Sequence, residues 1–348
     1  MKRTALFVTF ALAASAPAFA QQAAPAAQPA PAAAADPHAH HAQPAAAPAP
    51  SPSAAAAPGQ PAAPGTPGAP APGGPPMGQA NQPPPIDVPW NDALPAGTPA
   101  HAAQALKEST RKGEWVDIKM ADGTVLKSWV VYPSSSAKTG VVIVIHDIRG
   151  MADIPRAVGD QIAQDGFIAI VPDFLSGKGP NGGGTESLGP EVGKTIQGLT
   201  PADVNARLNA AMEYGKKLPA SNGKTGVIGF CWGGARSFGF AAAQPALNAA
   251  VVYYGDAPGS ADNSHETTLA NVKAPVLGLY AGNDARINAT LPGTEAAMKK
   301  LGKSYDVRTY EGAGHGFMFS QGGAGGANLK AAQESWPVVL QFFRKHLQ

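Results

Sequence analysis

A short Gly-rich segment holds the residue best suited to nucleophilic chemistry in this chain. Residues 227–234 read Val-Ile-Gly-Phe-Cys-Trp-Gly-Gly and put Cys231 in a Gly-x-Cys-x-Gly pattern. A buried-strand pattern precedes the cysteine and a helical pattern follows it, which is the order of a nucleophile elbow. Glycines suit this turn because side chains there would collide with the neighbouring strand and helix, and the helix amino end favours a thiolate. The alternative is a buried structural cysteine in a Gly-rich turn.

A cysteine nucleophile needs a base, and His315 is the best placed of the histidines that follow it. It lies in residues 311–317, Glu-Gly-Ala-Gly-His-Gly-Phe, directly after a predicted strand. Open α/β sheets hold their sites in loops at the carboxyl ends of their strands. His265 and His346 are interpreted as surface residues. The alternative for His315 is a solvated loop histidine.

An acidic residue should orient that histidine, and Asp284 follows the predicted strand 275–281. The resulting order of cysteine, aspartate and histidine is the one that accompanies this kind of elbow. Asp256, which follows the preceding strand, is the competing acid. The other role open to Asp284 is to cap the next helix.

The loop after the first buried strand is expected to stabilise negative charge during the reaction. It reads His-Asp-Ile-Arg-Gly over residues 146–150. In this arrangement the backbone N–H groups of Ile148 and Trp232 form an oxyanion hole. Asp147 is then expected close to the sulfur of Cys231, and His146 is interpreted as a structural residue at the strand end.

Strand and helix patterns alternate from about residue 102 onward. Asp122 and Gly123 form a hairpin turn, and runs of β-branched residues are typical of strands buried on both faces. The alternation predicts an α/β fold with a mostly parallel sheet and helices on both faces. The predicted strands are 114–120, 125–132, 140–146, 166–171, 225–230, 249–254, 275–281 and 305–310. The predicted helices are 154–164, 201–217, 234–243, 291–301 and 329–346, the last interrupted or bent near Pro337.

Three motifs together resemble the dienelactone hydrolase family, whose members have the α/β-hydrolase fold. They are Gly-Phe-Cys-Trp-Gly-Gly at 229–234, Pro-Val-Leu-Gly-Leu-Tyr-Ala-Gly-Asn-Asp-Ala-Arg-Ile at 275–287 and Gly-Ala-Gly-His-Gly-Phe at 312–317. The resemblance covers residues 112–348. It implies that Cys231, Asp284 and His315 form a catalytic triad, with no metal or organic cofactor.

Two departures from the family pattern bear on the substrate. The family's acidic residue in the loop at Asp147 is typically glutamate and is implicated in handling the thiol proton, and aspartate is one methylene shorter. Family enzymes that act on dienelactone also grip its carboxylate with two arginines. At the matching positions this chain has residues 175–178, Leu-Ser-Gly-Lys, and Phe319. A bidentate clamp is therefore not expected, although Lys178 or Arg149 offers a single charge.

The first hundred residues differ in composition from the rest. Lys2 and Arg3, a short apolar run and Ala-Phe-Ala at 18–20 predict a signal peptide over residues 1–20 and hence a periplasmic or secreted protein. Residues 21–101 are rich in Ala, Pro, Gly and Gln, which predicts a disordered segment before a folded domain at 102–348. This segment is interpreted either as a tether that contacts the cell envelope or as a solubilising tail. Its Asp-Pro-His-Ala-His-His run at 36–41 lacks the supporting residues of a metal site.

Composition also limits the classes of partner that the chain is expected to bind. The formal net charge of +2 gives no reason to expect nucleic acid as a partner, and no later run is long and apolar enough to span a membrane. The sequence therefore predicts an exported hydrolase of small ester or lactone substrates that acts through a thioester intermediate. The alternatives are a non-catalytic envelope binding protein and an acyltransferase or peptidase on the same scaffold.

Overall fold

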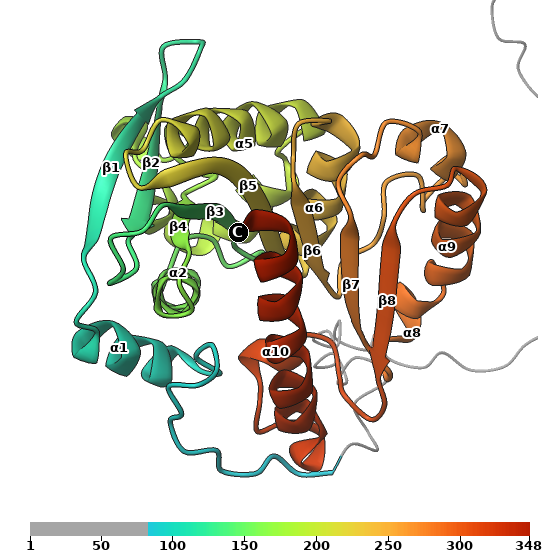
Figure 1. Cartoon of the computed structure of the whole chain (residues 1–348). Coiled ribbons are helices and arrows are strands. Elements are labelled where there is room, and N and C mark those ends of the chain that lie inside the picture. The colour runs from blue at the N-terminus through green and yellow to red at the C-terminus, as the bar shows by residue number, and fades with distance from the viewer. Residues whose placement is uncertain (1–82) are drawn as a thin grey trace, which may run out of the picture. The chain divides into compact units, whose positions relative to one another are not determined.

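One eight-stranded sheet organises the part of the chain that the structure, a computed structural model, describes, which is residues 83–348 (Figure 1). The strand order is β1-β2-β4-β3-β5-β6-β7-β8. Strand β2 runs antiparallel to both of its neighbours, and all pairings from β4 to β8 are parallel. The predicted mostly parallel sheet is confirmed. The strands are β1 Gly113–Lys119, β2 Val125–Val131, β3 Thr139–Ile145, β4 Ile168–Pro172, β5 Ser221–Phe230, β6 Ala249–Tyr253, β7 Val276–Ala281 and β8 Tyr305–Tyr310.

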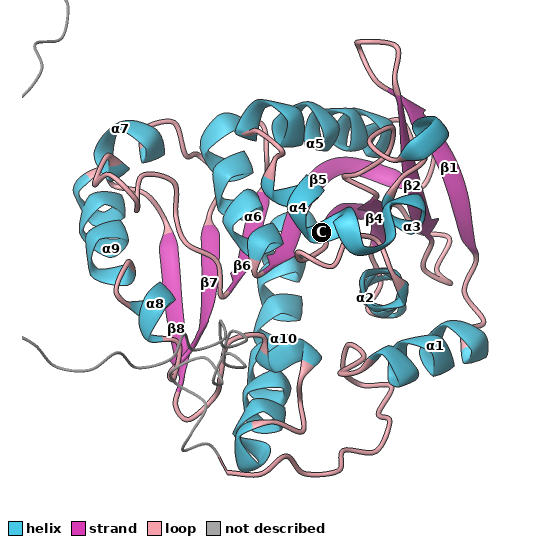
Figure 2. Ribbon diagram, turned by 180° about the vertical axis from the view of Figure 1, so that it is seen from behind, coloured by secondary structure: helices cyan, strands magenta, loops and turns pink. Residues whose placement is uncertain are grey.

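Helices cover both faces of this sheet. Figure 1 shows α10 in front of the strands, and the view from behind in Figure 2 shows α4 and α6 in front. All five predicted helices are present. The helices α3, α4, α7 and α8 were not predicted because they are too short for a clear 3.6-residue period, and α1 was not predicted because its first residues lie in the segment expected to be disordered. The helices are α1 Pro99–Glu108, α2 Asp153–Gln164, α3 Thr185–Leu188, α4 Val192–Gln197, α5 Pro201–Lys216, α6 Trp232–Ala243, α7 His265–Leu269, α8 Ala285–Asn288, α9 Leu291–Lys300 and α10 Ala327–Leu347.

Alternating side chains of the central strands enter two separate hydrophobic clusters. In β3, Val141 and Ile143 pack into a cluster with residues of α5, α6 and α9, whereas Val142 and Val144 pack into a second cluster with α2 and α10. Every residue of β3 is buried. A strand with period-two side chains that is covered on both faces must be apolar throughout, which explains the continuous β-branched run in the sequence.

The closing helix α10 continues through Pro337, so the interruption expected there is absent. A proline inside a helix removes one backbone hydrogen bond and costs about 3 kcal/mol. Burial offsets this cost, because Trp336, Val339 and Phe343 are each at most 1% exposed in the second cluster.

Ordered packing begins earlier than the expected boundary at residue 102. Leu94 and Ala96 are 5% and 1% exposed, and helix α1 starts at Pro99. The side chain of Gln321 donates a hydrogen bond of 2.9 Å to the carbonyl of Pro95. The disorder expected over residues 21–101 is therefore wrong for residues 83–101. The sequence did not reveal this because the packing surface belongs to distant parts of the chain.

The remaining predictions for the leading part of the chain lie outside the described residues. These are the signal peptide at 1–20, the disordered segment up to residue 82 and the histidine-rich run at 36–41. Within residues 83–348, none of the helices combines the length and the apolar character that crossing a membrane requires.

Candidate functional site

Cys231 occupies a strained turn between β5 and α6. Its backbone has φ 55° and ψ −116°, a conformation that costs a non-glycine residue roughly 1–3 kcal/mol. A Cβ atom on Gly229 would lie 2.0 Å from the carbonyl oxygen of Gly233, and one on Gly233 would lie 2.4 Å from that of Ile145. Both obstacles are backbone atoms, so the steric reason expected for the two glycines is confirmed.

The turn sets the cysteine at the amino end of a helix and beside the next strand. The N–H of Cys231 donates to the carbonyl oxygen of Tyr253 over 3.1 Å, and the residue is half-buried. Helix α6 begins at Trp232, whose N–H has no partner inside the helix because the first four helical N–H groups never do. The helix dipole therefore favours negative charge at this position.

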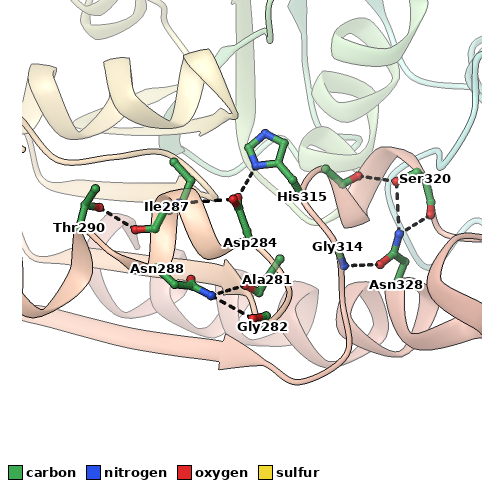
Figure 3. Close-up of polar contacts among 11 residues, drawn as sticks. Ala281, Gly282, Asp284, Ile287, Asn288, Thr290, Gly314, His315, Ser320 and Asn328 are labelled. Atoms are coloured by element: carbon green, nitrogen blue, oxygen red, sulfur yellow. Dashed lines mark hydrogen bonds and ion pairs between the residues drawn. The ribbon is translucent and has the colours of Figure 1, made fainter. Parts of the chain in front are cut away.

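His315 and Asp284 are in direct contact at the carboxyl ends of β8 and β7 (Figure 3). The Nδ1 atom of His315 lies 2.5 Å from Oδ2 of Asp284. The other oxygen, Oδ1, accepts the N–H of Ile287 over 3.3 Å, so Asp284 also caps α8. Asp284 therefore makes the contact that each of the two roles considered for it requires. Asp256 is half-buried and makes no hydrogen bond with His315 among the described residues.

The environment of His315 favours the protonated imidazole. Burial lowers the pKa of His315, but the hydrogen bonds to Asp284 and Cys231 and their negative charges outweigh burial and raise the pKa to about 9. For Asp284, burial is the largest single cause and raises the pKa, but the hydrogen bond and charge of His315 together with the N–H of Ile287 outweigh it, so the net pKa lies below its usual value. Cys231 is hydrogen-bonded to the backbone of Tyr253, and the ring of the next residue, Tyr254, lies 5.0 Å from that of His315, so the elbow and the imidazole are neighbours. Within residues 83–348, His315 and Cys231 make no hydrogen bond as well formed as that between His315 and Asp284.

Backbone contacts from two sides hold the loop that carries His315. On one side, the N–H of Asn283 donates to the carbonyl of Ala313 over 2.9 Å. On the other, the side chain of Asn328 in α10 accepts the N–H of Gly314 over 2.8 Å and donates to Ser320 (Figure 3). Sequence reasoning missed Asn328, and its signal is weak because an asparagine in the first turn of a helix has many other roles.

Asp147 forms an ion pair with Arg149 in the loop after β3. The Nη2–Oδ2 distance is 2.5 Å, and the Arg149 guanidinium also stacks over the ring of Phe319 at 5.7 Å. The hydrogen bonds that Arg149 donates to Asp147 raise the pKa of Arg149, and both residues line a cavity with Phe230, the residue before Cys231. Lys178 is exposed, and its charge acts on Asp203. Of the two single charges considered for the substrate, Arg149 is the one beside the elbow.

Ile148 and His146, the residues on either side of Asp147, differ in burial. The side chain of Ile148 is 43% exposed, and the roles of its N–H and of Asp147 stay predictions. His146 is 1% exposed and uses both ring nitrogens, since Nδ1 contacts the carbonyl of Asp147 at 2.9 Å and Nε2 accepts from Phe174 N–H at 3.3 Å. Its ring stacks on Trp232 at 5.9 Å. Burial lowers the pKa of His146, so it is a neutral structural residue.

A cavity of about 100 Å³ lies at the end of the sheet where these loops meet. Asp147 and Arg149 form one wall, and the others are mostly apolar, with Phe230, Phe319 and Pro99 among them. A larger hollow of about 580 Å³ lies between β1 and α5 and contains none of the predicted site residues. Of the predicted site residues only Asp147 lines the smaller cavity, and Cys231, Asp284 and His315 do not, so this cavity lies beside Phe230 at the elbow.

The interpretation of His265 has an outcome here. His265 is 7% exposed and its Nε2 lies 3.2 Å from Ser260 Oγ, so its interpretation as a surface residue is wrong. The polar residues around His265 in the sequence suggested an exposed side chain, but they form the turn that buries its ring. Among residues 83–348 there is also no group of three or more histidine, cysteine or acidic side chains arranged to hold a metal ion.

Comparisons with known proteins identify the family and the fold of the chain. The model of the dienelactone hydrolase family matches residues 126–347. A Methylorubrum extorquens protein assigned by name to carboxymethylenebutenolidase is 30% identical over 237 residues, which are 66% of this chain and 80% of that protein. A Saccharolobus solfataricus protein with the same name is 27% identical over 256 residues, covering 65% of this chain and 96% of the relative. A Klebsiella pneumoniae crystal structure described as a dienelactone hydrolase matches with a TM-score of 0.58 and 24% identity, covering 68% of this chain and all of that chain. The last match confirms the predicted α/β-hydrolase fold.

Proposed function

Since this chain belongs to the dienelactone hydrolase family, we propose that it is a carboxylic ester hydrolase that cleaves small ester or lactone bonds with a Cys231–His315–Asp284 triad. No metal or organic cofactor enters the proposed reaction. The observation that carries the proposal is the contact of 2.5 Å between His315 and Asp284 beside a cysteine in a strained elbow. A buried structural cysteine needs neither the strain nor an oriented imidazole, so the arrangement favours a nucleophile.

The first half of the reaction forms a thioester. His315 takes the proton of the Cys231 thiol, and its raised pKa supports a state in which imidazolium and thiolate coexist. The thiolate attacks the carbonyl carbon of the ester, and the oxyanion that forms accepts hydrogen bonds from the backbone N–H groups of Trp232 and Ile148. The carbon–oxygen bond to the alcohol then breaks, and His315 gives its proton to the departing alkoxide.

The second half of the reaction releases the acid. With the alcohol gone, neutral His315 accepts a proton from a water molecule, which attacks the thioester carbonyl. The carbon–sulfur bond breaks, the acid leaves, and the sulfur recovers the proton from His315. Throughout, Asp284 keeps the Nδ1–H of His315 pointing toward itself, so that Nε2 faces the reacting atoms.

The site also bears on the class of substrate. The Asp147 carboxylate already pairs with Arg149, so a carboxylate on the substrate would have to compete with it. Apolar walls such as Phe319 and Pro99 favour small, largely uncharged groups. We therefore propose small neutral esters or lactones as substrates, and we propose that Asp147 assists the thiol proton only if the pair with Arg149 opens.

Hydrolysis of 4-nitrophenyl acetate by the purified chain tests the proposal. Activity should fall by on the order of 10⁴-fold or more in Cys231→Ala and in His315→Ala, because removal of either member disables the unit. The exposed cation variant Lys178→Ala is the matched control and should keep full activity. Undiminished activity in Cys231→Ala would remove Cys231 from the chemistry.

A non-catalytic envelope binding protein is the rival that the absent arginines favour. It predicts a Cys231 that iodoacetamide labels slowly near neutral pH and no turnover of any ester. Acyltransferase or peptidase activity would appear instead as new products when an alcohol or amine acceptor is added. We also propose export to the periplasm or the medium, on the basis of the leading sequence.

A further inference from the structure

We propose that the hydroxyl of Tyr254 is a hydrogen-bond donor to the negatively charged sulfur of Cys231 and is thus a further catalytic residue. Tyr254 directly follows β6, and the sequence analysis gave it no role. The inference rests on the proposed cysteine hydrolase, because it concerns the same sulfur.

The backbone of Tyr254 is strained in a way that aims its side chain. Its φ is 39°, which is rare for a bulky aromatic residue. Two hydrogen bonds impose it, since the carbonyl of Tyr253 accepts the N–H of Cys231 and the N–H of Tyr254 donates to Leu279 over 2.9 Å. The next residue, Gly255, then passes so close to α6 that an added Cβ would lie 2.2 Å from the Ala235 nitrogen. Strain of this kind persists where the surroundings enforce it, and it clusters at active sites.

The ring of Tyr254 lies under the catalytic groups. Its centroid is 5.0 Å from that of His315 and 5.3 Å from that of Phe317. The residue is 1% exposed, and its hydroxyl makes no hydrogen bond with any residue of the described part of the chain. A buried donor without a partner is destabilising, and a negatively charged sulfur that forms beside it during the reaction would supply that partner.

Four charged or titratable groups besides His315 act on this hydroxyl. They are Asp147 and Arg149, from the loop after β3, Tyr253, the preceding residue, and Cys231, from the elbow. The charges of Asp147, Tyr253 and Cys231 favour the neutral phenol, whereas that of Arg149 favours the phenolate. Burial, the largest cause, and these charges together raise the pKa of Tyr254 well above its ordinary value. The phenol therefore stays protonated and remains a donor at any working pH. Since Asp147 already accepts from Arg149, the thiolate is the acceptor left without a donor on this side.

The chemistry needs such a donor twice. Negative charge sits on the sulfur before attack, and it returns to the sulfur when the thioester bond breaks and the acid leaves. A hydrogen bond from a neutral phenol stabilises both states and moves no proton, so the reaction balances as described above.

The pH dependence of Cys231 alkylation by iodoacetamide tests the proposal, because it reports thiolate and needs no ester substrate. In Tyr254→Phe the ring and the strain stay and only the hydroxyl is lost. The pH of half-maximal alkylation should rise by about one unit or more, and the rate below that pH should fall about tenfold. Replacement of Tyr254 by 3-fluorotyrosine, whose hydroxyl is more acidic, should move the midpoint the opposite way and covers the case in which Tyr254→Phe does not fold.

Tyr310→Phe is the matched control. The Tyr310 hydroxyl is likewise buried without a partner in residues 83–348, and its ring contacts the same Phe317 at 5.6 Å, but it faces Arg308 and Glu334. Its alkylation profile should equal that of the parent chain. If Tyr254→Phe also matches the parent while esterase activity persists, the role of Tyr254 is refuted and the triad stands. A parent chain whose cysteine resists alkylation and which cleaves no ester refutes both.

Discussion

Asp284 divides its two carboxylate oxygens between two tasks: Oδ2 lies 2.5 Å from Nδ1 of His315, and Oδ1 accepts the N–H of Ile287 at the start of α8. The orientation of the imidazole and the first turn of α8 therefore depend on one side chain. Substitutions of Asp284 can separate the two functions, because asparagine caps a helix well and alanine does not.

Asp284→Asn should lower kcat by about 10³- to 10⁴-fold with little change in melting temperature. The asparagine carbonyl keeps the cap, but its amide cannot hold the required tautomer of His315. Asp284→Ala should lose the same activity and in addition about 1 kcal/mol of stability, measured by urea unfolding. Equal stability of the two variants would mean that the cap contributes nothing.

The free energy of unfolding should depend on the protonation of His315. Its folded pKa of about 9 lies above the ordinary 6.5, so the stabilisation is complete below about pH 6.5 and is lost as the pH rises through about 9. With the side chain 33% exposed, solvent screening limits the effect to about 1–2 kcal/mol. Urea titrations at pH 6 and pH 9.5 should show this loss in the parent chain and a smaller one in His315→Gln.

Glycine substitutions around the elbow should differ sharply from one outside it. Gly229→Ala and Gly233→Ala place a Cβ against backbone oxygens at 2.0 and 2.4 Å and should destabilise the fold by about 3 kcal/mol or more. Gly239→Ala in the same α6 meets nothing within 4 Å and should stabilise by up to about 1 kcal/mol. Thermal unfolding of the three variants measures the contrast, and equal melting temperatures would contradict it.

Stepwise truncation tests where the folded part begins. A chain that starts at Pro83 should melt at the same temperature as one that starts at Gln21. A chain that starts at Ser109 loses the buried Leu94 and Ala96 and the bond from Gln321 to Pro95, so it should melt several degrees lower. A melting temperature unaffected by the second truncation would show that the segment adds no stability.

Export predicts a defined start of the mature chain. Expression of the full chain in a bacterium should give a product whose amino terminus is Gln21, recovered outside the cytoplasm. Mass spectrometry of the intact protein measures the cleavage, and a variant with Ala20 replaced by a bulky residue serves as the control. A product that retains Met1 would contradict the prediction.

Local pattern was sufficient for the sheet and the elbow. The continuous β-branched run of β3 and the glycines at 229 and 233 encode their own environments, since burial on both faces and close backbone contact each restrict the residue type directly. The pairing of Asp284 with His315 was also within reach, because the carboxyl ends of neighbouring parallel strands meet at one edge of the sheet.

What escaped the sequence depends on contacts between distant segments. The segment before α1 is rich in proline and alanine like the residues that precede it, and the contact with Gln321 and the burial of Leu94 depend on residues far away in the sequence. The ring of Tyr254 and the amide of Asn328 have no local signature either, because their roles come from His315 and its loop. The polar residues around His265 suggested an exposed side chain, because the contacts that bury it are not visible in the local sequence.

The backbone N–H of Ile86 donates to the carbonyl of Gly322 over 2.7 Å, seven residues beyond His315. The beginning of the described segment is thus hydrogen-bonded to the stretch of chain that follows His315 (Figure 1). Removal of residue 86 would therefore take away one backbone contact of the stretch that follows His315, whereas the strands of the sheet would keep all of their own pairings.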